Sequence, residues 1–102
     1  MIKENDYKNR VLIKTGIIRL SNLLDQQFAT ELNFRNHCYL RIAYDNTVKN
    51  KWDNVIEKPF INNASEAELQ NVLFLLNRYL QDKKLLVLHN KFSLGFRKIK
   101  IN

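Results

Sequence analysis

The sequence predicts an all-α fold, a compact bundle of four helices in one domain that covers residues 1–102. Two observations lead to this prediction. Only two glycines and one proline occur in 102 residues, which leaves few positions that break helices. Apolar residues also recur at spacings of three and four, as in amphipathic helices. We expect helices at 10–32, 36–56, 65–81 and 83–95, joined by short loops that favour antiparallel neighbours.

The first expected helix, 10–32, has one continuous apolar face. Its apolar residues are Ile13, Ile17, Leu20, Leu24 and Phe28. Gly16 lies inside this pattern, where glycine costs about 1 kcal/mol of helix stability relative to alanine. A glycine at such a position predicts a kink or a close contact with another helix.

The second expected helix, 36–56, begins at Asn36 as its N-cap and ends before Pro59, since the residue before a proline disfavours the α conformation. Its apolar pattern changes face midway. Cys38, Tyr39, Ile42 and Ala43 share one face, and Tyr44, Val48, Trp52 and Val55 share nearly the opposite one. The helix is therefore either buried on both faces or broken near Asn46 and Thr47.

The third and fourth expected helices have recognisable start signals. Ser65 and Glu68 form the pattern of a capping box directly before an apolar run, and Asp82 can cap the helix at 83–95. Residues 84–96 also fit a β-hairpin, because four consecutive apolar residues are followed by a second apolar group. Helix and hairpin both remain open there. The residues after 96 are expected to form a basic tail.

The net charge is +7, and the excess lies at the two ends of the chain. Residues 1–19 carry a net charge of +3, residues 83–102 carry +6 without any acidic residue, and the middle carries −2. Such a distribution favours association with polyanions. The candidate nucleic-acid-binding residues are Lys83, Lys84, Arg97, Lys98 and Lys100.

Three polar residues of the second helix break its pattern. On an unbroken helix His37, Arg41 and Asp45 continue the apolar stripe that contains Trp52. Places where local rules fail are often functional sites, so these three, with Tyr44 and Trp52, are the candidate ligand-binding residues. The structural alternative is an ion pair between Arg41 and Asp45, four residues apart, with His37 bonded to a backbone carbonyl.

No catalytic residue, metal site or cofactor is predicted. His37 and Cys38 are adjacent, so a helix would point their side chains about 100° apart, which excludes a thiol–imidazole dyad. The histidines and the cysteine lack the spacings of metal ligands, and no glycine-rich phosphate loop is present. These absences favour a protein without catalytic activity.

The sequence predicts a cytoplasmic protein that does not cross a membrane. The longest apolar run, residues 72–76, is far shorter than a membrane-spanning helix. The N-terminus lacks the apolar stretch of a secretory signal. A single cysteine, Cys38, excludes an internal disulfide and fits a reducing compartment.

The favoured function is a small helical interaction module that binds protein partners or a second copy of itself. Phe74, Val87 and Leu94 fall outside the main apolar stripes of their helices, and exposed apolar residues mark interfaces. We expect a homo-oligomer that buries Phe74 or the side with Val87 and Leu94. One alternative is a nucleic-acid-binding protein that uses its basic ends. A second is a small-ligand binder or enzyme with a polar site on the second helix.

Overall fold

The computed structural model describes residues 2–32 and 36–99, and their fold is all-α, as predicted. Met1, residues 33–35 and residues 100–102, among them the candidate Lys100, lie outside the described part. The elements are α1 (Ile2–Phe28), α2 (Asn36–Val48), the 3₁₀ helix η1 (Trp52–Asn54), α3 (Phe60–Asn63), α4 (Glu66–Gln81) and α5 (Lys83–Ile99). No strand occurs among these residues, so the hairpin alternative for 84–96 is wrong.

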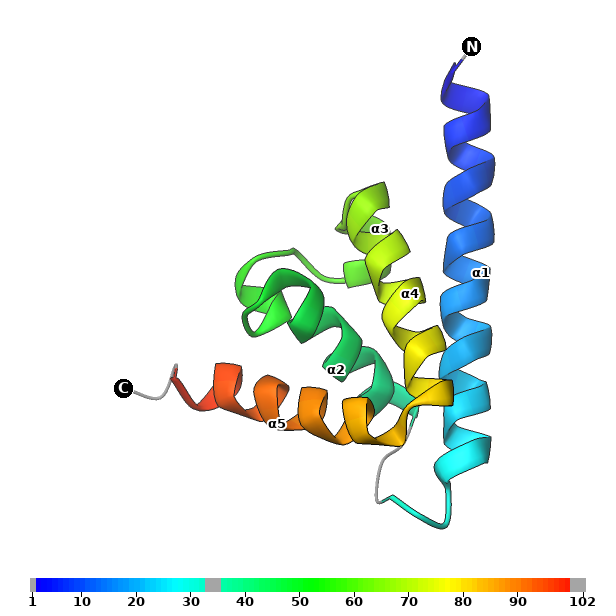
Figure 1. Ribbon diagram of the computed structural model, residues 1–102. Coiled ribbons are helices and arrows are strands. Elements are labelled where there is room, and N and C mark those ends of the chain that lie inside the picture. The colour runs from blue at the N-terminus through cyan, green and yellow to red at the C-terminus, as the bar shows by residue number, and fades with distance from the viewer. Residues whose placement is uncertain (1, 33–35, 100–102) are drawn as a thin grey trace.

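Helices α1 and α4 lie side by side and run in the same direction, while α5 crosses their far ends at a steep angle (Figure 1). Arg10 near the start of α1 donates to the carbonyl of Ala64, 3.0 Å away, just before α4. At the other end, Gln27 donates to the carbonyl of Leu80 at 2.7 Å. Helix α2 packs against α1, α4 and α5, and so occupies the middle of the fold.

The second helix is shorter than predicted and breaks where its apolar pattern changes face. Helix α2 ends at Val48, and Lys49 takes a left-handed conformation with φ of 60°. The amides of Lys49 and Asn50 both donate to the carbonyl of Asp45, at 2.8 and 3.2 Å, which closes the helix end. Pro59 therefore does not end this helix; it stands directly before α3 as its N-cap.

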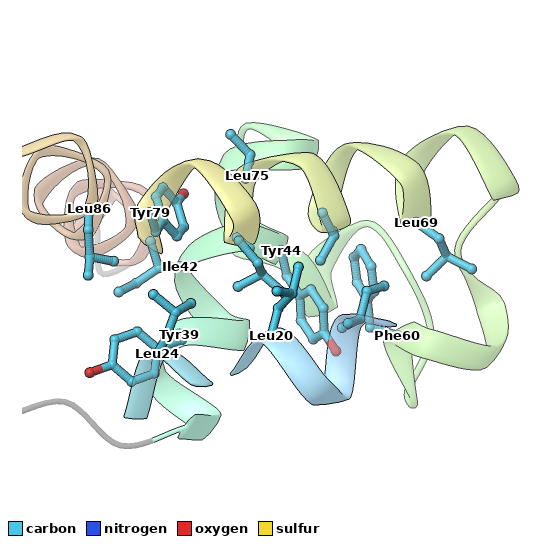
Figure 2. Packing of buried hydrophobic residues seen from close by; sticks show 14 of the residues in the cluster. Leu20, Leu24, Tyr39, Ile42, Tyr44, Phe60, Leu69, Leu75, Tyr79 and Leu86 are labelled. Carbon is cyan, nitrogen blue, oxygen red and sulfur yellow. The ribbon is translucent and has the colours of Figure 1, made fainter. Parts of the chain in front are cut away.

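The segment after α2 folds back and completes the core with aromatic rings (Figure 2). Tyr44 and Phe60 stack with ring centroids 3.8 Å apart, and Trp52 meets both rings edge-on at 5.6 Å. Tyr44 and Phe60 are buried, and burial raises the pKa of Tyr44 to about 12. Trp52 thus reaches the core because the chain turns, not because a long helix continues, while Val55 of the same predicted face stays exposed.

The predicted start signals of the last two long helices are confirmed. Ser65 and Glu68 form both hydrogen bonds of a capping box, at 3.1 and 2.8 Å. The carboxylate of Asp82 accepts from the amide of Leu85 at 3.1 Å, which caps α5. Because acceptors of this kind satisfy amides that the first turn leaves unpaired, they fix where a helix begins.

Gly16 lies in the contact between α1 and α4, next to the side chain of Leu73. A Cβ atom at this position would lie 3.0 Å from Cδ1 of Leu73, closer than carbon atoms normally pack. The absence of a side chain therefore lets the two helices come together, which is the close contact that the sequence predicted.

We expect Phe60→Ala to lower the free energy of unfolding by about 3–5 kcal/mol, since it removes a buried ring from the aromatic group and leaves a cavity. Urea denaturation measures the change. The matched control is Val55→Ala in the same segment, where the side chain is 53% exposed and the expected change is within about 0.5 kcal/mol. Equal losses in the two variants would contradict the packing described here.

Candidate functional site

A buried carboxylate, Asp45, lies where α2, η1 and α5 meet, and its side chain has no exposure to solvent. One oxygen accepts from the amide of Trp52 at 2.9 Å, and the other accepts from the hydroxyl of Ser93 at 2.6 Å. Arg97 donates to both oxygens, through Nε at 2.8 Å and Nη2 at 3.2 Å. We call Asp45, Trp52, Ser93 and Arg97 the Asp45 cluster.

Arg41 does not pair with Asp45, so the ion pair expected within α2 is wrong. Its guanidinium instead donates to the side-chain oxygen of Asn90 on α5 at 2.7 Å. Arg97 approaches the carboxylate from another helix and presents two donors at once, which is the geometry of the strongest arginine–carboxylate pairs. Burial is the main cause that lowers the pKa of Arg41 from its ordinary value.

Two further polar contacts join α5 to its neighbours. The amide of Asn46, which is buried, donates to the carbonyls of Ile42 at 2.8 Å and His89 at 2.9 Å. The imidazole Nδ1 of His89 lies 2.6 Å from the hydroxyl of Tyr79 on α4. Burial, followed by the charge of Lys49, lowers the pKa of His89, which favours the neutral ring.

Four of the five candidate ligand-binding residues, Arg41, Tyr44, Asp45 and Trp52, have described side chains, and these are held in packed or hydrogen-bonded contacts. Asp45 is enclosed by its donors, and Arg41 lies beside it with its guanidinium bonded to α5. Tyr44 and Trp52 belong to the aromatic group of the core, with the Trp52 amide also in the Asp45 cluster. The side chain of His37 lies outside the described part of the structure. The arrangement of Arg41 and Asp45 holds α5 against α2.

The sequence does not indicate Ser93, Asn90 or Asn46 as partners in this region. It suggests nucleic-acid binding, not a contact with Asp45, for Arg97. Ser93 is fully buried, yet a lone serine in an amphipathic helix gives no local signal of a buried carboxylate. The phase of α5 offers one signal: Leu86, Ser93 and Arg97 share the face that packs inward.

The candidate nucleic-acid-binding residues divide into two groups. Lys83 is paired with Glu31 at 2.9 Å, and Arg97 is paired with Asp45, so both already have anionic partners. Lys84 and Lys98 are exposed, as is Lys91, which was not among the candidates. None of these three lysines pairs with an acidic residue among the side chains that the structure describes, those of residues 9–32 and 38–98.

Exposed apolar side chains accompany these lysines on the same side of α5. Val87, Leu88, Phe92 and Leu94 each expose between 40% and 47% of their surface. We define the α5 outer face as Lys84, Val87, Leu88, Lys91, Phe92, Leu94 and Lys98. Val87 and Leu94, which fall outside the main apolar stripe of their helix, belong to this surface.

Phe74, which falls outside the main apolar stripe of α4, lines a groove between α1 and α4 with a volume of about 540 Å³. Its ring is 55% exposed, and the guanidinium carbon of Arg78 lies 5.9 Å from its centroid. Ile13, Gly16 and Leu73 contribute to the apolar lining. We call this hollow the α1–α4 groove.

Features of other classes of protein are missing from the described residues. Among the described side chains, those of residues 9–32 and 38–98, no three His, Cys, Asp or Glu are grouped so that they could hold a metal ion. None of the helices described combines the length and apolarity needed to span a bilayer.

We expect Arg97→Leu to destabilise the protein by about 3–5 kcal/mol, because it leaves the fully buried Asp45 carboxylate without its cation. Asp45→Asn should cost less, about 2–3 kcal/mol, because Arg97 is partly exposed and can turn toward water. Thermal and urea unfolding of both variants measure this order. Losses below about 1 kcal/mol in both would show that the pair contributes no more than a surface ion pair.

The stability of the protein should depend on the ionisation of His89. The pKa of this ring lies below its ordinary value of 6.5 in the folded state, so the folded protein disfavours its protonation. The contribution is therefore fully present above pH 6.5 and is lost as the pH falls through the lowered pKa. We expect the difference in unfolding free energy between pH 7.5 and pH 5 to be smaller in His89→Gln than in the unmodified protein. An unchanged difference would contradict this assignment.

Comparisons with models of protein families, with curated proteins and with solved structures found no match to this chain. Function must therefore be inferred from the Asp45 cluster and the two exposed apolar surfaces.

Proposed function

We propose that this protein is a non-catalytic interaction module whose α5 outer face binds an acidic, amphipathic helix of a protein partner. The observation that carries the proposal is a line of three exposed lysines, Lys84, Lys91 and Lys98, at intervals of seven residues. Residues at this interval lie on nearly the same side of a helix, about 10.5 Å apart along its axis.

Apolar side chains flank this line on both sides. At 100° per residue, Val87 and Leu94 lie on one side of the lysines, and Leu88 and Phe92 lie on the other. All four are substantially exposed. Removal of such side chains from water favours association, so the surface offers apolar contact area around a cationic centre.

The charge of this surface selects an acidic partner. Helix α5 contains no acidic residue, and its remaining cations, Lys83 and Arg97, already pair with Glu31 and Asp45. The charge of the lysine line is therefore directed at solvent. Carboxylates spaced along a partner helix would match it, and such complementarity raises the rate and the selectivity of association.

Other occupants fit this face less well. Two copies in contact here would bring their lysine lines together, which is repulsive. A membrane surface would place the lysines, which run along the middle of the face, where the apolar side chains insert. Nucleic acid would pair with the lysines but would leave aliphatic side chains such as Val87 and Leu94 without an apolar counterpart, since its surface is mostly phosphate and sugar.

The Asp45 cluster supports this role because it fixes the orientation of α5. Its contacts from Ser93 and Arg97 lie on the inner side of the helix, about two and three turns along from Leu86, which is fully buried. Because the backbone of a helix held in this way is already ordered, partner binding loses only the conformational entropy of the side chains on the outer face.

The proposal predicts the kind of peptide that the protein selects from a displayed library of amphipathic helices about 18 residues long, or five turns. Selected peptides should combine Asp or Glu with Leu, Ile or Phe on one face. Their affinity should fall at least about tenfold for the triple variant Lys84→Gln, Lys91→Gln and Lys98→Gln. Fluorescence anisotropy with the labelled peptides measures the dissociation constants.

The matched control removes three lysines elsewhere, Lys49→Gln, Lys51→Gln and Lys58→Gln, which lowers the net charge equally. This variant should keep the affinity within about threefold. Selected peptides without acidic residues, or equal losses in the two triple variants, would overturn the proposal. A single-stranded oligouridylate of about 20 nucleotides that binds at physiological salt, with an affinity unchanged in Leu88→Ser and Phe92→Ser, would favour the nucleic-acid reading instead.

A further inference from the structure

The α1–α4 groove combines a hollow with a projecting ring. The hollow exists in part because Gly16 has no side chain, and Phe74 projects at its edge with more than half of its surface exposed. A surface with a projection next to a hollow is complementary to a second copy turned by 180°, because each projection then meets the other copy's hollow.

We propose that two copies of this protein pair through the α1–α4 groove, with the Phe74 ring of each copy in the groove of the other. Phe74 lies at the middle of α4, which runs from Glu66 to Gln81. A two-fold axis that passes near Phe74 and runs perpendicular to α4 places the two α4 helices antiparallel, with their midpoints next to each other.

The charges of α4 favour this antiparallel pairing. Its first turn is acidic, with Glu66 and Glu68, and its last turn is basic, with Arg78. In an antiparallel pair, the acidic first turn of one α4 lies towards the basic last turn of the other, so the ends of the two helices attract rather than repel each other. Arg19, which lines the groove from α1, adds a second cation for the same carboxylates.

Apolar surface extends beyond the groove along α1. Leu12 and Leu23, which are 70% and 36% exposed, are four and seven residues from Gly16 and lie on the same side of the helix. The surface that pairing would cover thus includes Leu12, Leu23 and Phe74, three of the large apolar side chains that the fold leaves in water.

The excess positive charge of the chain does not oppose this contact. Five cations and no acid are on α5, a helix that does not line the groove. Pairing at the groove therefore keeps the lysines of the α5 outer face away from the contact and available to a partner. The two surfaces are independent, and the failure of one proposal leaves the other intact.

The first test is the mass of the full chain in solution, measured by sedimentation equilibrium from about 10 μM to about 1 mM. We expect the mass to rise from 12.2 kDa towards twice this value. Phe74→Ala should raise the dimer dissociation constant at least about tenfold. The matched control is Phe92→Ala on the α5 outer face, where a ring of similar exposure is removed, and it should leave the constant unchanged.

The second test locates the contact by cross-linking. The natural cysteine is removed by Cys38→Ser, and Asn77→Cys places a thiol in the lining of the groove. A bis-maleimide should link two such chains efficiently. Ile18→Cys in the same background is the control, because this exposed position is turned about 160° from Gly16 on α1.

Three outcomes would overturn the proposal. The first is a mass that stays at 12.2 kDa over the whole concentration range. The second is a dimer that Phe74→Ala and Phe92→Ala weaken equally, or that Phe92→Ala alone weakens, which would place the contact on α5. The third is equal cross-linking of the Asn77→Cys and Ile18→Cys proteins.

Discussion

The carboxylate of Asp45 is the group on which the arrangement of α2, η1 and α5 depends. A buried carboxylate is tolerated only when its oxygens accept hydrogen bonds and its charge is matched. Here the donors come from three segments far apart in the sequence, the Trp52 amide, the Ser93 hydroxyl and the Arg97 guanidinium. The reversal of the chain after α2 and the direction of α5 are therefore two consequences of one requirement.

This requirement also explains why α5 leaves so much apolar surface in water. The inner side of the helix is occupied by polar contacts, through Asn90, Ser93 and Arg97, in addition to the buried Leu86. Apolar residues on other sides of α5 cannot reach the core without breaking these contacts. Apolar side chains of α5 thus remain on its outer surface because its inner surface makes the contacts to the Asp45 carboxylate.

The parts of the fold that the sequence predicts are those set by local chemistry. The capping box at Ser65 and the apolar face of α1 depend on residues within a few turns, and both are confirmed. The sequence predicts the start of α1 at residue 10, whereas the helix begins at Ile2, because the apolar periodicity that indicates the helix begins only at Ile13. The partner of Asp45 could not be found in this way, since Arg97 is 52 residues distant and Arg41 offered a nearer cation. The exposed lysines of α5 were predictable from their interval of seven residues, once the helix was preferred to the hairpin.

Trp52 gives the protein a built-in optical reporter. It is the single tryptophan of the chain, and its indole packs against Tyr44 and Phe60 while its amide is bound to Asp45. Indole emission depends on the polarity around the ring, so its wavelength reports whether the segment after α2 is seated on the core. If α5 detaches from the Asp45 carboxylate, the change is therefore observable in the unlabelled protein as a shift in the fluorescence of Trp52, which lies outside α5.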